Sequence, residues 1–131
     1  MGVAENIAAV RRFYEAGPAA DDRERVPFAS PDIVWHVPGD NRVSGEYRGA
    51  KAVFATMPAS MQPLDRWEID LCDVMGNGPF VVATVEIRGT RYGRSLETRG
   101  AHLFRLRDGL IQEAWGFTVD QASLDALLDP L

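Results

Sequence analysis

The chain has 131 residues, a length that supports one domain with its own hydrophobic core. Its 14 basic and 19 acidic residues give a net charge of −5 without any run of Lys or Arg, which argues against nucleic-acid binding. The single cysteine, Cys72, excludes an internal disulfide and fits a reducing cytoplasm. No apolar run reaches the roughly 20 residues that span a bilayer, and no signal-peptide pattern is present. We therefore expect one soluble, cytoplasmic domain over residues 1–131.

Helices are predicted in the first half of the chain, where apolar residues recur at helical spacing. Each predicted helix ends close to a proline, because proline cannot continue a helix. The stops are Gly17-Pro18, Pro31 and Pro58. The helices span, in chain order, Val3 to Ala16, Asp21 or Asp22 to about Phe28, and Ala50 to Met57.

The stretch from Ile33 to Gly49 carries a histidine near the end of a short strand. Alternation places Val34 and His36 on one face of this strand and Trp35 on the other. Pro38 lacks an amide hydrogen and ends the strand beside the histidine, as at the mouth of a pocket. A second short strand is expected to lead from here to the helix that follows.

Long strands are predicted from Leu64 to Val119, with a bend at Gly89. Two turn signals separate them, the cluster Gly76-Asn77-Gly78-Pro79 and the pair Asp108-Gly109. The strands and the helix after them are a first strand around Trp67, then Phe80–Arg88, Ser95–Arg107, Leu110–Val119 and helix Gln121–Leu128, which Asp120 can cap. Helices followed by an antiparallel meander predict an α+β fold with helices on one face of a curved sheet.

Three stretches carry a family resemblance: Trp35-His36-Val37-Pro38-Gly39, Ser44-Gly45-Glu46-Tyr47-Arg48-Gly49, and Asp108-Gly109-Leu110-Ile111 followed by Trp115 and Asp120. They resemble the SnoaL-like branch of the nuclear transport factor 2-like superfamily, over Ile7 to about Leu128. The resemblance implies a cystatin-like cone, in which a bent, mixed or antiparallel sheet wraps around N-terminal helices and encloses an apolar pocket, usually in homodimers. The superfamily includes ketosteroid isomerases, polyketide cyclases, epoxide hydrolases and non-catalytic association domains, so the fold does not choose a function.

The same resemblance implies chemical roles for individual residues. His36 falls where ketosteroid isomerases carry their general-base aspartate, and His102 falls near their protonated oxyanion-hole aspartate. Tyr14 resembles their oxyanion tyrosine. Asp120 lies where SnoaL-type cyclases carry a general base, although it is equally placed to cap the last helix. Histidines can do the work of these carboxylates, because a neutral imidazole can accept a proton or donate a hydrogen bond.

Further residues are expected to line the pocket. Both histidines are assigned to the inner face, although His36 can also be a core histidine satisfied by backbone groups.

No third ligand has recognisable spacing with them, and the chain has no phosphate-binding loop or dinucleotide fingerprint, so we expect neither a metal nor a cofactor. Gly100 either leaves room for a ligand or marks a bend. The residues expected to contact substrate are Val34, Gly100, Phe104, Trp115 and Phe117.

These residues predict a cofactor-independent enzyme acting on a small hydrophobic carbonyl compound, polyketide-like or steroid-like. His36 or Asp120 would remove a proton, and Tyr14 with His102 would hold the enolate, giving isomerisation or aldol-type cyclisation. The resemblance also implies an alternative, epoxide hydrolysis of the limonene-epoxide type with Asp120 orienting water. Those hydrolases carry an Arg-x-Asp pair on an earlier strand, and the corresponding Thr84-Val85-Glu86 lacks the arginine. A non-catalytic ligand-binding or dimerisation module is the third possibility. We expect a homodimer with no nucleic-acid or membrane partner.

Overall fold

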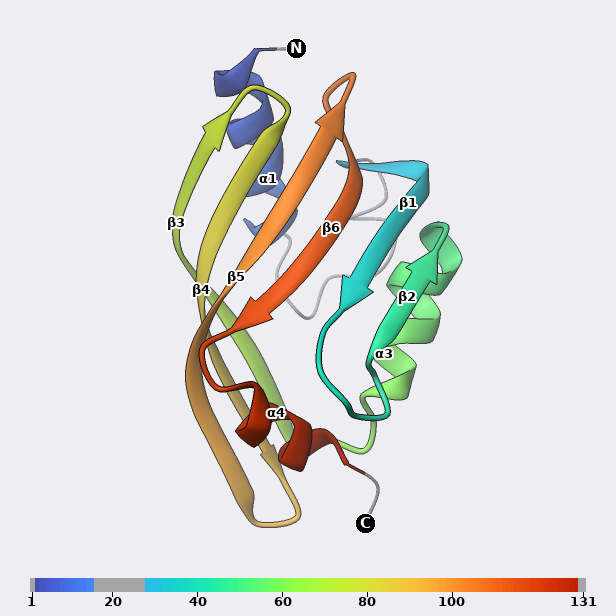
Figure 1. The fold of residues 1–131 in the computed structure, drawn as a ribbon, viewed down its shortest axis with the longest axis vertical. Coiled ribbons are helices and arrows are strands. Elements are labelled where there is room, and N and C mark those ends of the chain that lie inside the picture. The colour runs from blue at the N-terminus through green and yellow to red at the C-terminus, as the bar shows by residue number, and fades with distance from the viewer. Residues whose placement is uncertain (1, 16–27, 130–131) are drawn as a thin grey trace.

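The computed structural model describes residues 2–15 and 28–129 of the chain (Figure 1). Its class is α+β, as predicted. The elements are α1 (Val3–Glu15), β1 (Ala29–Val37), β2 (Gly45–Arg48), the π-helical segment η2 (Ala52–Thr56), α3 (Met57–Ser60), β3 (Arg66–Asn77), β4 (Phe80–Arg91), β5 (Arg94–Arg107), β6 (Leu110–Thr118) and α4 (Gln121–Leu128). Within the described residues, no helix has the length and apolar character needed to cross a membrane.

One six-stranded sheet organises the fold, with the order β2-β1-β6-β5-β4-β3. Strands β3 to β6 form the predicted antiparallel meander. Strand β1 pairs parallel with β6 and antiparallel with β2, so the sheet is mixed. Figure 1 shows the curved sheet with α1 behind its strands, α4 across its lower end and α3 beside β2. The helices and the concave face of the sheet therefore enclose the interior, as expected for a cone.

An aromatic cluster connects α1 to the sheet. The ring of Phe13 on α1 has centroids of four other rings within 6.2 Å, those of Tyr14, Trp35, Phe54 and Phe104. Phe104 on β5 is fully buried and makes edge contacts with Tyr14 and Trp35. Edge-to-face aromatic pairs add stabilisation beyond their buried area. The cluster fixes α1 and β1 against the middle of the sheet.

The predicted element boundaries differ from the structure at Pro31, Pro58 and Gly89. The segment predicted as a second helix lies mostly in residues 16–27, outside the described part of the chain, and Pro31 does not end a helix because it lies within β1. Irregular pairing between Ala29 and Val34 leaves room for a residue without an amide hydrogen. Pro58 stands at the start of α3, where helices tolerate proline, so the third helix continues to Ser60. Strand β4 also passes Gly89 and ends at Arg91.

Phe104→Ala should lower the free energy of unfolding by about 3–5 kcal/mol, because it leaves a cavity in the aromatic cluster. Phe80→Ala is the matched control, since Phe80 lies on the neighbouring strand but is 43% exposed. The control should cost less than half as much in urea unfolding followed by tryptophan fluorescence. Equal losses in the two variants would contradict the central position of Phe104.

Candidate functional site

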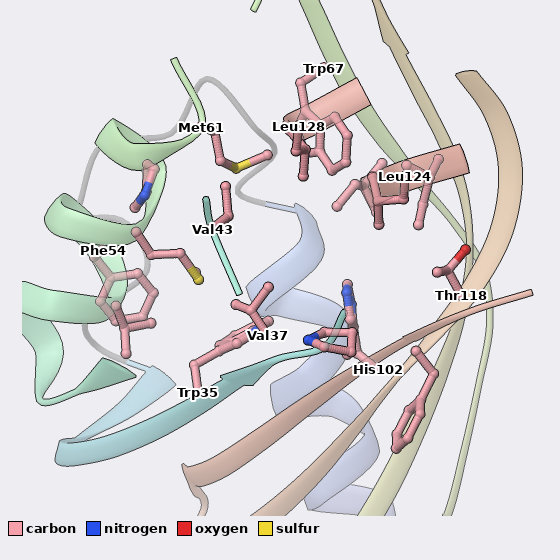
Figure 2. A pocket seen from close by; sticks show the side chains of 18 of the residues that line it. Trp35, Val37, Val43, Phe54, Met61, Trp67, His102, Thr118, Leu124 and Leu128 are labelled. Atoms are coloured by element: carbon pink, nitrogen blue, oxygen red, sulfur yellow. The ribbon is translucent and has the colours of Figure 1, made fainter. Parts of the chain in front are cut away.

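A cavity of about 270 Å³ lies between the concave face of the sheet and the helices. Its walls are mainly apolar and aromatic, and Figure 2 shows Trp35 and Phe54 on one side and Trp67 and Leu128 on the other. Among the described lining residues there is no Asp, Glu, Lys or Arg. Hydroxyl and imidazole groups reach it only from Tyr14, His102 and Thr118 within this set.

The polar groups on the cavity floor form a pair. The Tyr14 hydroxyl is hydrogen-bonded to Nδ1 of His102, and the two rings stack at a centroid distance of 5.8 Å. Strand β5 places His102 in register with Ala83 on β4 and Gly116 on β6, so its side chain points to the concave face. Helix α1 supplies Tyr14 from the position that follows the buried Phe13. Two of the predicted site residues are therefore brought together in the cavity.

His102 is neutral at pH 7. Burial lowers the pKa of His102 from its ordinary value of 6.5 to about 4, because the charged ring would lose its hydration. The ring keeps some accessible surface, as expected for a residue that faces the cavity. A neutral imidazole has one donor and one acceptor nitrogen. Since Tyr14 engages Nδ1, the nitrogen left for a ligand is Nε2.

His36 lies on the opposite face of the sheet, so the expectation that both histidines face inward does not hold. Its Nε2 is 2.6 Å from Oε2 of Glu113, and its ring stacks on Trp115 at 5.3 Å. The hydrogen bond from His36 is the largest cause of a lowered pKa of Glu113. Trp35, the neighbour of His36, lines the cavity instead. The apolar partners Ile33 and Val37 on the Trp35 face were the sequence signal for the inner side.

A bulge in β6 explains why other predicted wall residues point outward. Arg105 of β5 pairs with Glu113, while the next residue, Leu106, pairs with Ile111. Two steps along β6 thus match one step along β5, and the alternation of faces changes there. Both Ile111 and Ala114 are fully buried as a result.

The bulge separates Trp115 from Ile111, which regular alternation would place on the same face of β6. Trp115 pairs in register with His36 and lies with it outside the cavity. Phe117 lines the edge of the cavity but is 53% exposed. Val34, in register with Glu113, is also outside the lining. Gly116, between the two aromatic residues, reaches the cavity and was missed by sequence reasoning.

Three further predicted residues have structural roles in place of cavity contacts. Phe104 belongs to the buried aromatic cluster and does not line the cavity. A Cβ atom on Gly100 would stand 2.4 Å from the carbonyl oxygen of Phe117, so this glycine permits the close approach of β5 and β6. Asp120 caps α4 as predicted, accepting a hydrogen bond of 3.1 Å from the Ser123 amide. Hydrogen bonding to the Ser123 side chain, and then to this amide, lowers the pKa of Asp120. It is exposed and outside the lining.

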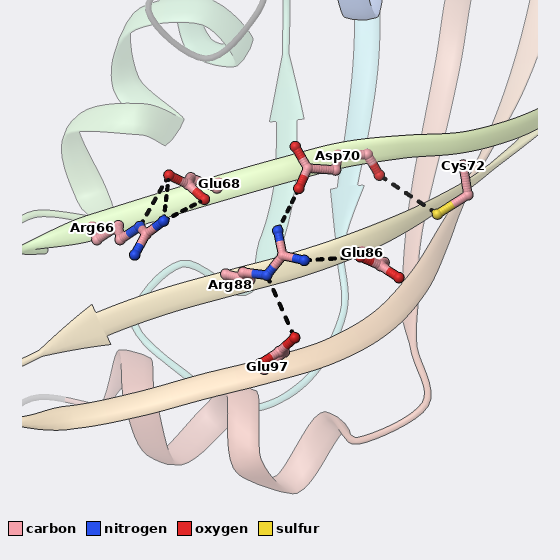
Figure 3. Close-up of polar contacts among 7 residues, drawn as sticks. All are labelled: Arg66, Glu68, Asp70, Cys72, Glu86, Arg88 and Glu97. Atoms are coloured by element: carbon pink, nitrogen blue, oxygen red, sulfur yellow. Dashed lines mark hydrogen bonds and ion pairs between the residues drawn. The ribbon is translucent and has the colours of Figure 1, made fainter.

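Charged residues on the outer face form ion pairs within a strand and between strands. Figure 3 shows Arg88 of β4 bonded to Asp70 at 2.5 Å and to Glu86 at 3.0 Å, with Glu97 at 3.5 Å. Exposed pairs of this kind contribute little stability. Over the described ranges, no three His, Cys, Asp or Glu side chains gather as a metal site would require.

Comparison with known proteins agrees with this architecture. Residues 10–114 match the SnoaL-like domain, and the chain therefore belongs to the SnoaL-like family. An uncharacterised protein of Mycobacterium tuberculosis is 29% identical over 119 residues, which cover 89% of this chain and 91% of that protein. A protein of unknown function from Xanthomonas campestris has a cystatin-like fold, with a TM-score of 0.86, 31% identity, and coverage of 95% of this chain and 98% of that one. The predicted fold is confirmed.

A second similar structure has a suggested activity. It is a proposed SnoaL-like polyketide cyclase from Jannaschia, with a TM-score of 0.79 and 20% identity, and the match covers 98% of this chain and 95% of that one. At this identity the likeness concerns the fold alone. The chemistry of this chain therefore has to be argued from its own cavity.

The buried imidazole should make stability depend on pH. Between pH 4 and pH 6.5 the unfolded chain protonates His102 and the folded chain does not, so stability falls as the pH drops through this window. Urea unfolding of the wild type should show about 2 kcal/mol more loss between pH 7 and pH 5 than His102→Asn shows. The difference between the two proteins removes the contribution of other groups. Parallel losses would mean that His102 is not held neutral by burial.

Proposed function

We propose that the protein is a cofactor-independent enzyme that moves a proton on a small hydrophobic carbonyl compound, giving isomerisation or aldol-type cyclisation. The observation that carries this proposal is the Tyr14–His102 hydrogen bond on the floor of an apolar cavity. An apolar site with a few converging polar groups and a shifted pKa is typical of a ligand site. Membership of the SnoaL-like family supports a small-molecule ligand.

In the proposed reaction, His102 is both base and acid. Nδ1–H donates to the Tyr14 oxygen, which leaves the Nε2 lone pair facing the substrate. Nε2 takes a proton from the carbon next to the carbonyl, the C–H electron pair moves into an enolate, and the new imidazolium returns the proton to another carbon. Return at a different carbon is isomerisation. In cyclisation the enolate carbon attacks a second carbonyl group of the same molecule, the π electrons of that group move to its oxygen, and the imidazolium gives its proton to the resulting alkoxide. Tyr14 orients the ring by holding Nδ1.

Burial lowers the pKa of His102, because it removes water from the imidazolium. In the proposed reaction, an enolate formed in contact with the imidazolium supplies the opposite charge. The low-dielectric cavity strengthens this attraction. The proposed intermediate is thus an ion pair that forms and disappears with the movement of one proton.

A second candidate is ligand binding without chemistry. It is favoured by the absence of any carboxylate among the described lining residues and by the weak basicity of His102. The geometry gives less support to epoxide hydrolysis, since Asp120 lies outside the cavity lining. Homodimer formation and a cytoplasmic location stay predictions. Size-exclusion chromatography with light scattering would test the dimer.

Deuterium exchange gives a direct test of proton removal. In heavy water the wild type should accelerate exchange of the alpha protons of 2-tetralone, followed by NMR, and His102→Asn should lose roughly 10²–10⁴ of that acceleration. His36→Asn is the matched control and should keep the wild-type rate, because His36 faces away from the cavity. Loss of exchange in the His36 variant alone would overturn the assignment. Binding of 2-tetralone without accelerated exchange would favour the second candidate.

The pH profile separates the two histidine environments. The exchange rate per enzyme should be level from pH 8 to about pH 5 and should fall only as His102 becomes protonated, with a midpoint near its pKa of about 4. A base with an ordinary imidazole pKa would give a midpoint near pH 6.5. Initial rates in buffers of constant ionic strength provide the measurement. A midpoint near 6.5 would exclude a buried, neutral His102 as the base.

A further inference from the structure

Gly116 is the residue in the cavity wall whose identity the fold does not explain. It lies in β6, in register with His102, and lines the cavity. Its backbone does not have the positive φ that favours glycine. The three atoms nearest to a Cβ atom there would be Pro38 Cδ at 3.4 Å, His102 Cδ2 at 3.8 Å and the His36 carbonyl oxygen at 3.9 Å, all ordinary van der Waals distances.

Every described glycine from Gly39 onward, other than Gly116, has a local reason. One group has φ values between +60° and +135°, where side chains are strained: Gly39, Gly45, Gly49, Gly78, Gly93 and Gly109. In the other group a Cβ atom would approach a neighbouring atom to 3.2 Å or less: Gly76, Gly89 and Gly100. Glycine in a strand interior weakens the strand. Gly116 therefore lowers stability, and neither its backbone angles nor close packing requires a glycine there.

The space at the missing Cβ of Gly116 is called the slot below. An atom in this slot would be in van der Waals contact with Cδ of Pro38 and with Cδ2 of His102. Its His102 wall is Cδ2, the ring carbon bonded to Nε2, so a group entering the slot arrives next to the nitrogen that Tyr14 leaves available.

We infer that Gly116 is a specificity-determining position, which keeps this slot open for the flat carbonyl-bearing edge of a ring ketone with one or two fused rings. The inference rests on the proposed function, because it places the carbonyl carbon and its neighbour beside Nε2 of His102. Glycine in a strand commonly marks a place where a ligand approaches the backbone closely. A methyl group at this position would fill the slot and hold the ring away from His102.

The volume of the cavity bears on how many rings its ligand has. Its volume of about 270 Å³ lies just below the range of about 300–1,000 Å³ that is usual for drug-sized ligands. The aromatic walls, with Trp35 and Trp67 on opposite sides, suit flat ring faces (Figure 2). A cavity near the lower end of this range suits a two-ring ketone better than a rigid four-ring steroid.

The experiment compares wild type, Gly116→Ala and Gly116→Val, with 2-tetralone as the probe, tetralin as the same skeleton without its carbonyl, and progesterone as the four-ring ketone. Calorimetry measures affinity, and thermal unfolding measures stability. Gly116→Ala should unfold at the same temperature or higher, since the new methyl group has room, yet bind 2-tetralone roughly tenfold or more weakly. Gly116→Val should bind still more weakly. Gly100→Ala is the contrasting variant and should unfold at a lower temperature, because its methyl group meets the Phe117 carbonyl.

Each outcome has one meaning. Weaker binding of 2-tetralone with unchanged stability supports the inference, as does a wild type that prefers 2-tetralone to both tetralin and progesterone. Equal affinity in wild type and Gly116→Ala overturns the slot while the proposed function stands. A large loss of stability in Gly116→Ala overturns it too, since the glycine would then be structural. No binding of 2-tetralone by the wild type overturns the proposed function itself.

Discussion

The bulge between β5 and β6 decides which side chains reach the interior of this protein. By inserting one extra residue between Ile111 and Glu113, it brings Ala114 and Gly116 to the concave face and sends Trp115 to the convex face. A regular strand would have placed Trp115 in the space that the cavity now occupies. The open volume in front of His102 therefore depends on a backbone irregularity more than on the choice of any single wall residue.

The Tyr14–His102 pair lies beside that volume, and burial keeps the imidazole of His102 uncharged. The imidazole satisfies Nδ1 through Tyr14 and avoids the cost of an isolated cation by staying neutral. In this buried pair, Nε2 of His102 is the nitrogen left for a ligand. Such an arrangement is more typical of binding and catalytic sites than of protein cores. The outer histidine, His36, contacts Glu113 in a partly exposed network that also includes Arg105.

Local sequence patterns predicted the elements well because the signals are local. The turn at Asp108-Gly109, the four long strands and the Asp120 cap all follow from neighbouring residues, and the family resemblance supplied the cone. The face of the sheet on which each side chain lies was predicted poorly, because one irregularity reverses the alternation for every later residue of the strand. The count of alternate residues from Ile111 to Trp115 fails at a bulge that no residue type announces. For His36 the alternation was right and the choice of inner face was not, since the larger apolar surface of Trp35 takes the interior.

The two histidines of the chain lie on opposite faces of one sheet. Their partners in the sheet are consecutive residues of β6, since His36 pairs with Trp115 and His102 pairs with Gly116. The two rings therefore have different surroundings. Isotope labelling of histidine alone would thus give a spectrum with two ring systems, one reporting the cavity and the other the outer surface. A ligand entering the cavity would shift one set of signals, while a protein partner on the convex face would shift the other. The molecule carries its own pair of spectroscopic reporters, and the side on which an unknown compound or partner binds can be read without any substitution.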